Sequence, residues 1–173
     1  VYLMGYPGLE ERNKSWDAFM NDPEWAKVYE ASRANGPIVD SVVSTFLHYT
    51  EYSPKLQVVD NGPRIFSHRT YYTHPGKLEA LHRRFEDHTL EIFENSGMVN
   101  VAYFGLDSMH EASSRVLTYL ITSPDTTQLQ KSWDIFGKDP AWRSAYEQSI
   151  LNGPLVESIT DELMIPTAFS PLK

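Results

Sequence analysis

Four stretches in the second part of the chain show the residue pattern of β-strands. Residues 64–72 alternate between two sets of side chains and are rich in β-branched and aromatic residues, which predicts a strand. The same signal predicts strands over residues 98–106 and 115–121, with the polar residues 107–114 as the loop between them. A last strand is predicted over residues 155–165. These strands are expected to form one antiparallel sheet.

Apolar residues at spacings of three and four predict the helices that connect these strands. Such spacings indicate one amphipathic helix from Pro75, with Gly97 as its C-terminal stop. A second helix is predicted over residues 125–136. Asp139 is expected to cap a third helix that begins at Pro140, because proline lacks only a donor that is unpaired at that position anyway. The order is β-α-β-β-α-β with a divided second helix, which is the ferredoxin-like arrangement.

A ferredoxin-like unit covers only one face of its sheet with helices. The bare face must be buried, and two such sheets packed face to face form a barrel within one chain or between two chains. The predicted fold class is therefore α+β, with ferredoxin-like repeats whose antiparallel sheets form a dimeric α/β-barrel.

An internal repeat relates the beginning of the chain to its end. Lys14–Phe19 recurs as Lys131–Phe136 at an offset of 117 residues. The other matches at this offset are Asp22-Pro23 with Asp139-Pro140, Trp25 with Trp142, Asn35-Gly36-Pro37 with Asn152-Gly153-Pro154, and Ser53-Pro54 with Ser170-Pro171. Residues 1–56 are therefore predicted to be the C-terminal half of a first repeat, residues 57–63 a linker, and residues 64–173 a complete second repeat.

The half repeat predicts an assembly with another segment or chain. Residues 1–6 correspond to a strand of the complete repeat, so a strand is expected there without neighbours in its own half. Because an unpaired strand edge invites pairing, we expect at least a homodimer, or an associated N-terminal segment. The first residue is Val1, so a targeting segment could precede it, and the compartment stays open between the cytoplasm and export after removal of such a segment.

Composition argues against several classes of function. The formal net charge of −8 repels phosphate backbones, so no nucleic-acid partner is expected. The chain has no cysteine, and its histidines do not form an i,i+4 pair with a nearby acidic third ligand, so neither a metal site nor another cofactor is predicted. No apolar run approaches the roughly 18 residues that a membrane-spanning helix needs.

Several motifs together resemble one known family. They are Arg64-Ile65-Phe66-Ser67-His68-Arg69-Thr70-Tyr71, Pro75-Gly76-Lys77, Phe85, His88-Thr89, Phe93, Gly97-Met98, and the Trp-x-x-Phe and Asp-Pro-x-Trp pairs. They are similar to the NIPSNAP family over nearly the whole chain. The resemblance implies the dimeric α/β-barrel superfamily, which includes cofactor-free monooxygenases, haem-degrading enzymes and proteins without known activity. The family usually has Glu and Leu where this chain has Ser67 and His68, and a serine cannot replace that Glu as an acid or base.

Four residues are candidates for ligand binding: Arg69, Tyr71, His88 and Tyr103. By strand alternation, Arg69 and Tyr71 share a face that can point into the barrel, where the arginine would hold a carboxylate ligand or form an internal ion pair. His88 falls on the apolar side of its helix and is expected to face the sheet, as a general base, a haem ligand or a core histidine.

Aromatic side chains are expected to fill the rest of the interior. Tyr103 lies on the opposite strand face from Asn100, and Tyr119 and Tyr2 occupy equivalent places in the two copies, so they could line a cavity or simply pack. Tryptophans at repeat-related positions are interpreted as packing anchors. The preferred function is a non-catalytic or small-molecule-binding barrel. The alternative is a cofactor-free monooxygenase-like or haem-linked enzyme. The sequence assigns no catalytic residue, and whether the chain is an enzyme stays open.

Overall fold

The computed structural model describes residues 1–58 and 62–173, and the chain divides into two compact units, Val1–Ser44 and Thr45–Lys173. Residues 59–61, within the predicted linker, lie outside the described residues. The limits predicted for the two repeats remain a prediction, because the compact units follow spatial contacts and the repeats follow the sequence.

The larger unit contains a five-stranded antiparallel sheet with the order β1-β3-β4-β2-β5. Its strands are β1 Leu47–Tyr49, β2 Ile65–Thr73, β3 Val99–Leu106, β4 Val116–Ser123 and β5 Val156–Met164. Four of them lie within one or two residues of their predicted positions. The additional strand β1 lies within residues 1–56, the predicted first repeat, and pairs with the outer edge of β3.

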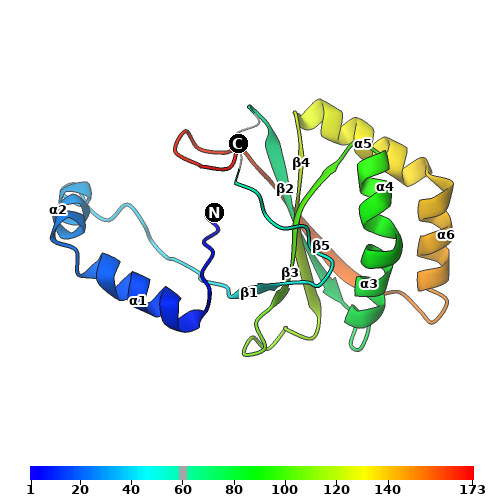
Figure 1. Ribbon diagram of the computed structural model, residues 1–173, viewed down its shortest axis with the longest axis horizontal. Coiled ribbons are helices and arrows are strands. Elements are labelled where there is room, and N and C mark those ends of the chain that lie inside the picture. Colours follow the sequence, from blue (N-terminus) through cyan, green and yellow to red (C-terminus); the bar gives the residue numbers. More distant parts are fainter. Residues whose placement is uncertain (59–61) are drawn as a thin grey trace. The chain divides into compact units, whose positions relative to one another are not determined.

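The helices of the larger unit all lie on one side of this sheet (Figure 1). They are α3 Leu78–Arg84, the π-helical turn η1 Phe85–Thr89, α4 Leu90–Asn95, α5 Thr126–Lys138 and α6 Pro140–Ser149. Helix α6 begins as predicted, because the Asp139 side chain accepts hydrogen bonds from the amides of Ala141 and Trp142. The α+β fold class and the ferredoxin-like arrangement are confirmed.

Two apolar clusters pack on the two faces of the sheet. The larger cluster lies between the sheet and the helices and contains Phe85, Phe93, Tyr103, Tyr119 and Phe136 among others. The smaller cluster lies on the face that we call the open face, and its members are Phe66, Val101, Ala102, Phe104 and Leu120. Segments at the end of the first repeat and at the C-terminus pack against this second cluster through Leu47, Leu56, Met164 and Leu172.

The smaller unit contains the helices α1 Leu9–Met20 and α2 Pro23–Ser32. None of the residues described in these two helices is buried. The strand predicted over residues 1–6 is wrong, because this segment has irregular backbone in the described structure. A strand is stabilised by hydrogen bonds to a neighbouring strand. The described part of this unit contains no strand with which residues 1–6 could pair.

Candidate functional site

Arg69 lies on the helix-covered face of β2, and its side chain is held by neighbours within the chain. Its Nη1 bonds to the Asp161 carboxylate on β5, whose other oxygen accepts a hydrogen bond of 2.6 Å from Ser67 Oγ. The guanidinium also lies over the ring of Trp133, 4.5 Å from its centroid. The expectation that Arg69 points into a barrel is therefore wrong, and the alternative of an internal ion pair is confirmed.

This arginine remains a cation. Burial alone would lower the pKa of Arg69, but the nearby Tyr119, Tyr71 and Asp161 together raise it above its ordinary value. An arginine that keeps its charge in a half-buried position needs its carboxylate partner. Asp161 therefore occupies the place that a carboxylate ligand would take.

Tyr71 and Tyr103 belong to a buried tyrosine cluster rather than to an open cavity. Tyr119 Oη donates to Tyr71 Oη over 3.1 Å, and the rings of Tyr103 and Tyr119 stack with centroids 5.0 Å apart. Burial raises the pKa values of Tyr103 and Tyr119 well above the ordinary value, so both remain phenols. Tyr103 Oη also donates to Asn100 Oδ1, because an irregularity between Asn100 and Ala102 brings the two residues to one face. The expectation that they lie on opposite faces is wrong.

His88 is exposed to solvent, which contradicts the expectation that it faces the sheet. His88 lies within η1, whose buried residues are Phe85 and Thr89. Thr89 is buried in place of His88, and its Oγ1 donates to the carbonyl of Arg84 over 3.0 Å. Of the four predicted candidates, Arg69, Tyr71 and Tyr103 therefore meet in the helix-side cluster, whereas His88 is exposed.

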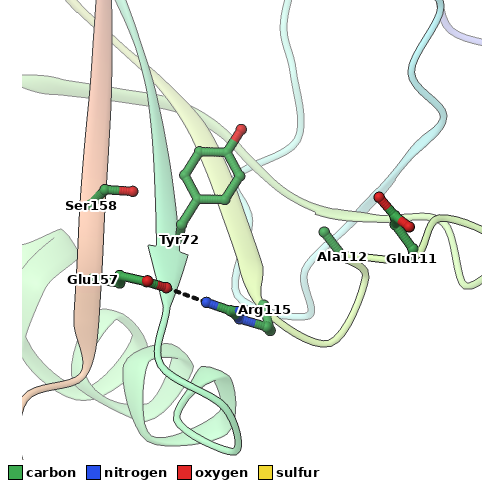
Figure 2. Close-up of a pocket in the computed structure, with 6 residues that line it drawn as sticks. All are labelled: Tyr72, Glu111, Ala112, Arg115, Glu157 and Ser158. Atoms are coloured by element: carbon green, nitrogen blue, oxygen red, sulfur yellow. Dashed lines mark hydrogen bonds and ion pairs between the residues drawn. The ribbon is translucent and has the colours of Figure 1, made fainter.

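A hollow of about 410 Å³ opens where the open face of the sheet meets the loop before β4 (Figure 2). Its lining residues are Tyr72, Glu111, Ala112, Arg115, Glu157 and Ser158. Tyr72 and Ser158 are paired between β2 and β5 and point away from the helices, because their neighbour Tyr71 belongs to the helix-side cluster. The volume falls within the range of pockets that hold small molecules.

Arg115 is held in a fixed position beside this hollow. Its Nε donates to the carbonyl of Thr73 over 2.8 Å, and its Nη2 bonds to Glu157, the pair joined by the dashed line in Figure 2. Tyr72 keeps 39% of its surface exposed. The sequence analysis missed Tyr72 and Arg115 because it took its candidates, Arg69 and Tyr71, from the other face of the strand predicted over residues 64–72. The signals that pointed to them were the second alternating set in residues 64–72 and the arginine that begins the strand predicted over residues 115–121.

Comparison with known proteins places the chain in a family. The NIPSNAP family profile matches residues 1–54 and 66–171, which is most of the chain. The chain belongs to the NIPSNAP family. Among curated protein sequences no match was found.

Solved structures of NIPSNAP proteins share the fold. A NIPSNAP family protein with unknown function from Agrobacterium tumefaciens is 22% identical with a TM-score of 0.56, covering 66% of this chain and 98% of that one. An uncharacterized NIPSNAP-like domain protein from Burkholderia xenovorans is 20% identical with a TM-score of 0.54, covering 62% and 89%. At these identities the likeness shows the fold alone. The chain is therefore a NIPSNAP-domain protein without an established reaction.

The described part of this NIPSNAP chain can also be checked for metal-binding groups and for membrane-spanning helices. Within residues 1–58 and 62–173, no group of three or more His, Asp or Glu side chains is arranged to hold a metal ion. In the same described part of the chain, every helix is too short or too polar to cross a membrane.

A histidine and a tyrosine are paired at the edge of the larger unit. Tyr52 Oη lies 2.7 Å from His82 Nδ1, and burial raises the pKa of Tyr52, so the phenol keeps its proton. Burial lowers the pKa of His82, and the neighbouring His48 lowers it further. Both effects favour the neutral form of His82, in which Nδ1 can accept a hydrogen bond from the tyrosine.

We expect this NIPSNAP chain to lose stability as the pH falls below about 6.5, the ordinary histidine pKa. The folded pKa of His82 lies below that value, so the unfolded chain binds a proton that the folded chain does not. The stabilisation is present above this pH and is lost as the pH falls. The measurement is thermal unfolding between pH 7.5 and 5.5 for the wild type and His82→Gln. Equal slopes in the two proteins would contradict the prediction.

Proposed function

We propose that this NIPSNAP chain is a non-catalytic protein that binds a small molecule in the hollow at Tyr72 and Arg115. The observation that carries the proposal is the hollow itself, in which a preformed arginine and an exposed aromatic ring lie together. Sites for small molecules combine apolar walls with a few fixed polar groups.

The positions of the predicted candidates favour binding over catalysis. An enzyme of the cofactor-free monooxygenase or haem-linked type needs its acid, base or ligand residues around one substrate. Here His88 is exposed on a helix, while Arg69 is engaged by Asp161 and Tyr103 is enclosed in the core. These positions support the non-catalytic alternative.

The charges around the hollow indicate what kind of molecule fits. Arg115 is already paired with Glu157, and Glu111 adds a second carboxylate, so the lining has a net negative charge. A carboxylate-bearing ligand would be repelled, whereas an uncharged or cationic group is favoured. Tyr72 offers a flat apolar surface for the body of the ligand. We propose a ligand with an aromatic or apolar body and an uncharged or cationic polar group.

We also propose that two copies of the chain pair through their open faces, as the sequence predicts. Phe66, Phe104 and Leu120 form a buried apolar cluster on this face, and beside it the rings of Tyr49 and Tyr72 remain exposed. Packing of a second sheet there would bury these rings and add a wall to the hollow.

Native mass spectrometry and saturation-transfer NMR test both parts of the proposal. The purified chain is expected as a dimer, and a library of uncharged and cationic aromatic fragments is expected to give ligands. Tyr72→Ala and Arg115→Ala should each weaken these ligands at least tenfold. The control Arg143→Ala removes an exposed arginine on α6 and should leave binding unchanged. A clean monomer would overturn the dimer, and ligands insensitive to both hollow variants would overturn the binding site.

A further inference from the structure

Arg69 and Arg84 both carry a positive charge into the helix side of the larger unit, and they differ in what neutralises it. Arg69 is bonded to the Asp161 carboxylate. Arg84 on α3 is only 6% exposed, and none of the ion pairs within the described residues includes it. A charge in a protein interior is stable when a counter-charge and hydrogen bonds replace its water. Arg84 therefore lacks the partner that its burial requires.

The groups that do contact the Arg84 guanidinium are neutral. Its Nη1 donates to Ser149 Oγ over 3.2 Å, and this hydroxyl donates in turn to the Tyr146 carbonyl over 2.7 Å. The guanidinium also lies over the rings of Trp142 and Tyr146, with its Cζ 5.1 and 5.6 Å from their centroids. Aromatic rings attract a cation but carry no net charge, so they do not neutralise the arginine.

Acidic side chains close to this site in the sequence do not supply the missing charge. Glu86 and Asp87 follow Arg84 on η1, and Glu147 follows Tyr146 on α6. All three are exposed, and in the part of the chain that the structure describes none of them forms an ion pair with Arg84. The described part of the larger unit thus leaves this cation without a carboxylate.

The pKa values of the two arginines reflect this difference. Burial lowers the pKa of Arg84 below its ordinary value, although nearby tyrosines act in the opposite direction. The pKa of Arg69, which has Asp161 as well as tyrosines beside it, lies above its ordinary value. An arginine stays protonated at neutral pH in both situations. A negative charge brought to Arg84 would therefore meet a full positive charge.

One edge of the Arg84 guanidinium has no hydrogen-bond partner. Its Nε is buried and donates to no acceptor within the described residues, and its Nη2 forms no hydrogen bond there either. The Nε–H and one N–H of Nη2 lie along the same edge of the planar group, and such a fork matches the two oxygens of a carboxylate. This edge can bind a carboxylate bidentately while Nη1 stays on Ser149.

We propose that this free edge of Arg84 binds a small carboxylate. The carboxylate-binding role that the sequence suggests for Arg69 is blocked there, because Asp161 already occupies the place. A monoanion suits the site better than inorganic phosphate, which carries more than one negative charge at neutral pH. One positive charge among neutral groups would leave part of the phosphate charge unbalanced in a buried position.

The ligand reaches Arg84 past the ring of Tyr146. This ring lies over the guanidinium and is 43% exposed, so it is a surface side chain that can change its rotamer. The opening left by one ring admits a small ion. The site lies on the helix side of the sheet, whereas the hollow at Tyr72 lies on the open face, so it does not depend on the ligand proposed for the hollow.

NMR spectra of the arginine Nε–H groups test the site in the wild-type chain. Sodium acetate is titrated in at pH 7.5, with sodium chloride adjusted to keep the ionic strength constant. The Arg84 signal is expected to shift until the site is saturated, because its Nε–H gains an acceptor. The Arg69 signal should stay in place, because Asp161 already neutralises that arginine. Phosphate should bind at least tenfold more weakly than acetate.

Three variants, followed through the backbone amides of α3 and α6, separate the site from general charge effects. Arg84→Lys keeps the charge but loses the planar fork, so it should weaken acetate binding at least tenfold. The matched control Arg83→Lys changes the neighbouring arginine, whose side chain is 63% exposed and paired with Glu79, and should leave binding unchanged. Tyr146→Ala removes the ring over the guanidinium and should strengthen binding.

An Arg84 signal that acetate does not shift in the wild type would overturn the proposal, whether or not the variants fold. A folded Arg84→Lys protein that binds acetate as tightly as the wild type would also overturn it. Phosphate binding as tight as acetate binding would contradict the assignment to a carboxylate. Weaker acetate binding by Tyr146→Ala would contradict the route past this ring. Ligands of the hollow are measured separately, so their absence would leave these results unaffected.

Discussion

Replacing Phe93 with alanine is expected to lower the free energy of unfolding of the larger unit by about 3–5 kcal/mol. The ring is only 1% exposed and contacts four other aromatic rings, so its removal leaves a cavity that rigid neighbours cannot fill. These neighbours are Phe85, Tyr119, Trp133 and Phe136. Urea unfolding followed by circular dichroism measures the change.

The matched control for this prediction is Phe169→Ala, which removes the same side chain from an exposed position. We expect its effect on the unfolding of the 173-residue chain to stay within about 0.5 kcal/mol. If both variants lost the same stability, the helix-side cluster would not be the core of the unit.

The order of strands and helices could be predicted from the sequence because nearly every element follows its own period. Residues 64–72 alternate, and the helix that ends before Gly97 repeats at three and four, as the structure confirms. Strand β1 could not be predicted, because a three-residue strand forms only where the edge of β3 supplies its hydrogen bonds.

The predicted site was less accurate than the fold for two physical reasons. Alternation shows that Arg69 and Tyr71 share a face, but both faces of β2 carry aromatic residues, so it does not show which face the helices cover. Helical spacing from Phe85 allows both His88, three positions on, and Thr89, four positions on, and the structure buries Thr89 within a π-helical turn. Both continuations lead to Ile92, so the sequence alone could not distinguish them.

The hollow at Tyr72 depends on contacts between distant segments. Arg115 is positioned by the carbonyl of Thr73 and by Glu157, each 42 residues away along the chain. Sequence patterns report local structure. They therefore predicted the loop before β4 and the strands β2 and β5, but not the hollow that forms where these segments meet.

Replacing Asp161 with asparagine is expected to lower the free energy of unfolding by about 2 kcal/mol. Asparagine keeps the shape of the side chain but leaves Arg69 as a half-buried cation without a counter-charge, which is costly in a protein interior. Removing one partner of a fully buried ion pair costs roughly 3–5 kcal/mol. The expected loss for Asp161→Asn is smaller, because the Asp161 side chain is 35% exposed and water screens part of its interaction with Arg69.

The neighbouring residue provides the control for this prediction. Glu162 lies on the opposite face of β5, where its carboxylate is 3.1 Å from His68 Nδ1 and 60% exposed. Glu162→Gln should therefore change the free energy of unfolding by less than about 0.5 kcal/mol. The double variant Arg69→Met/Asp161→Asn should recover part of the stability lost in Asp161→Asn, because it removes the unpaired cation. If the double variant were less stable than Asp161→Asn by the full cost of losing Arg69, packing on Trp133 rather than charge pairing would be the main role of this arginine.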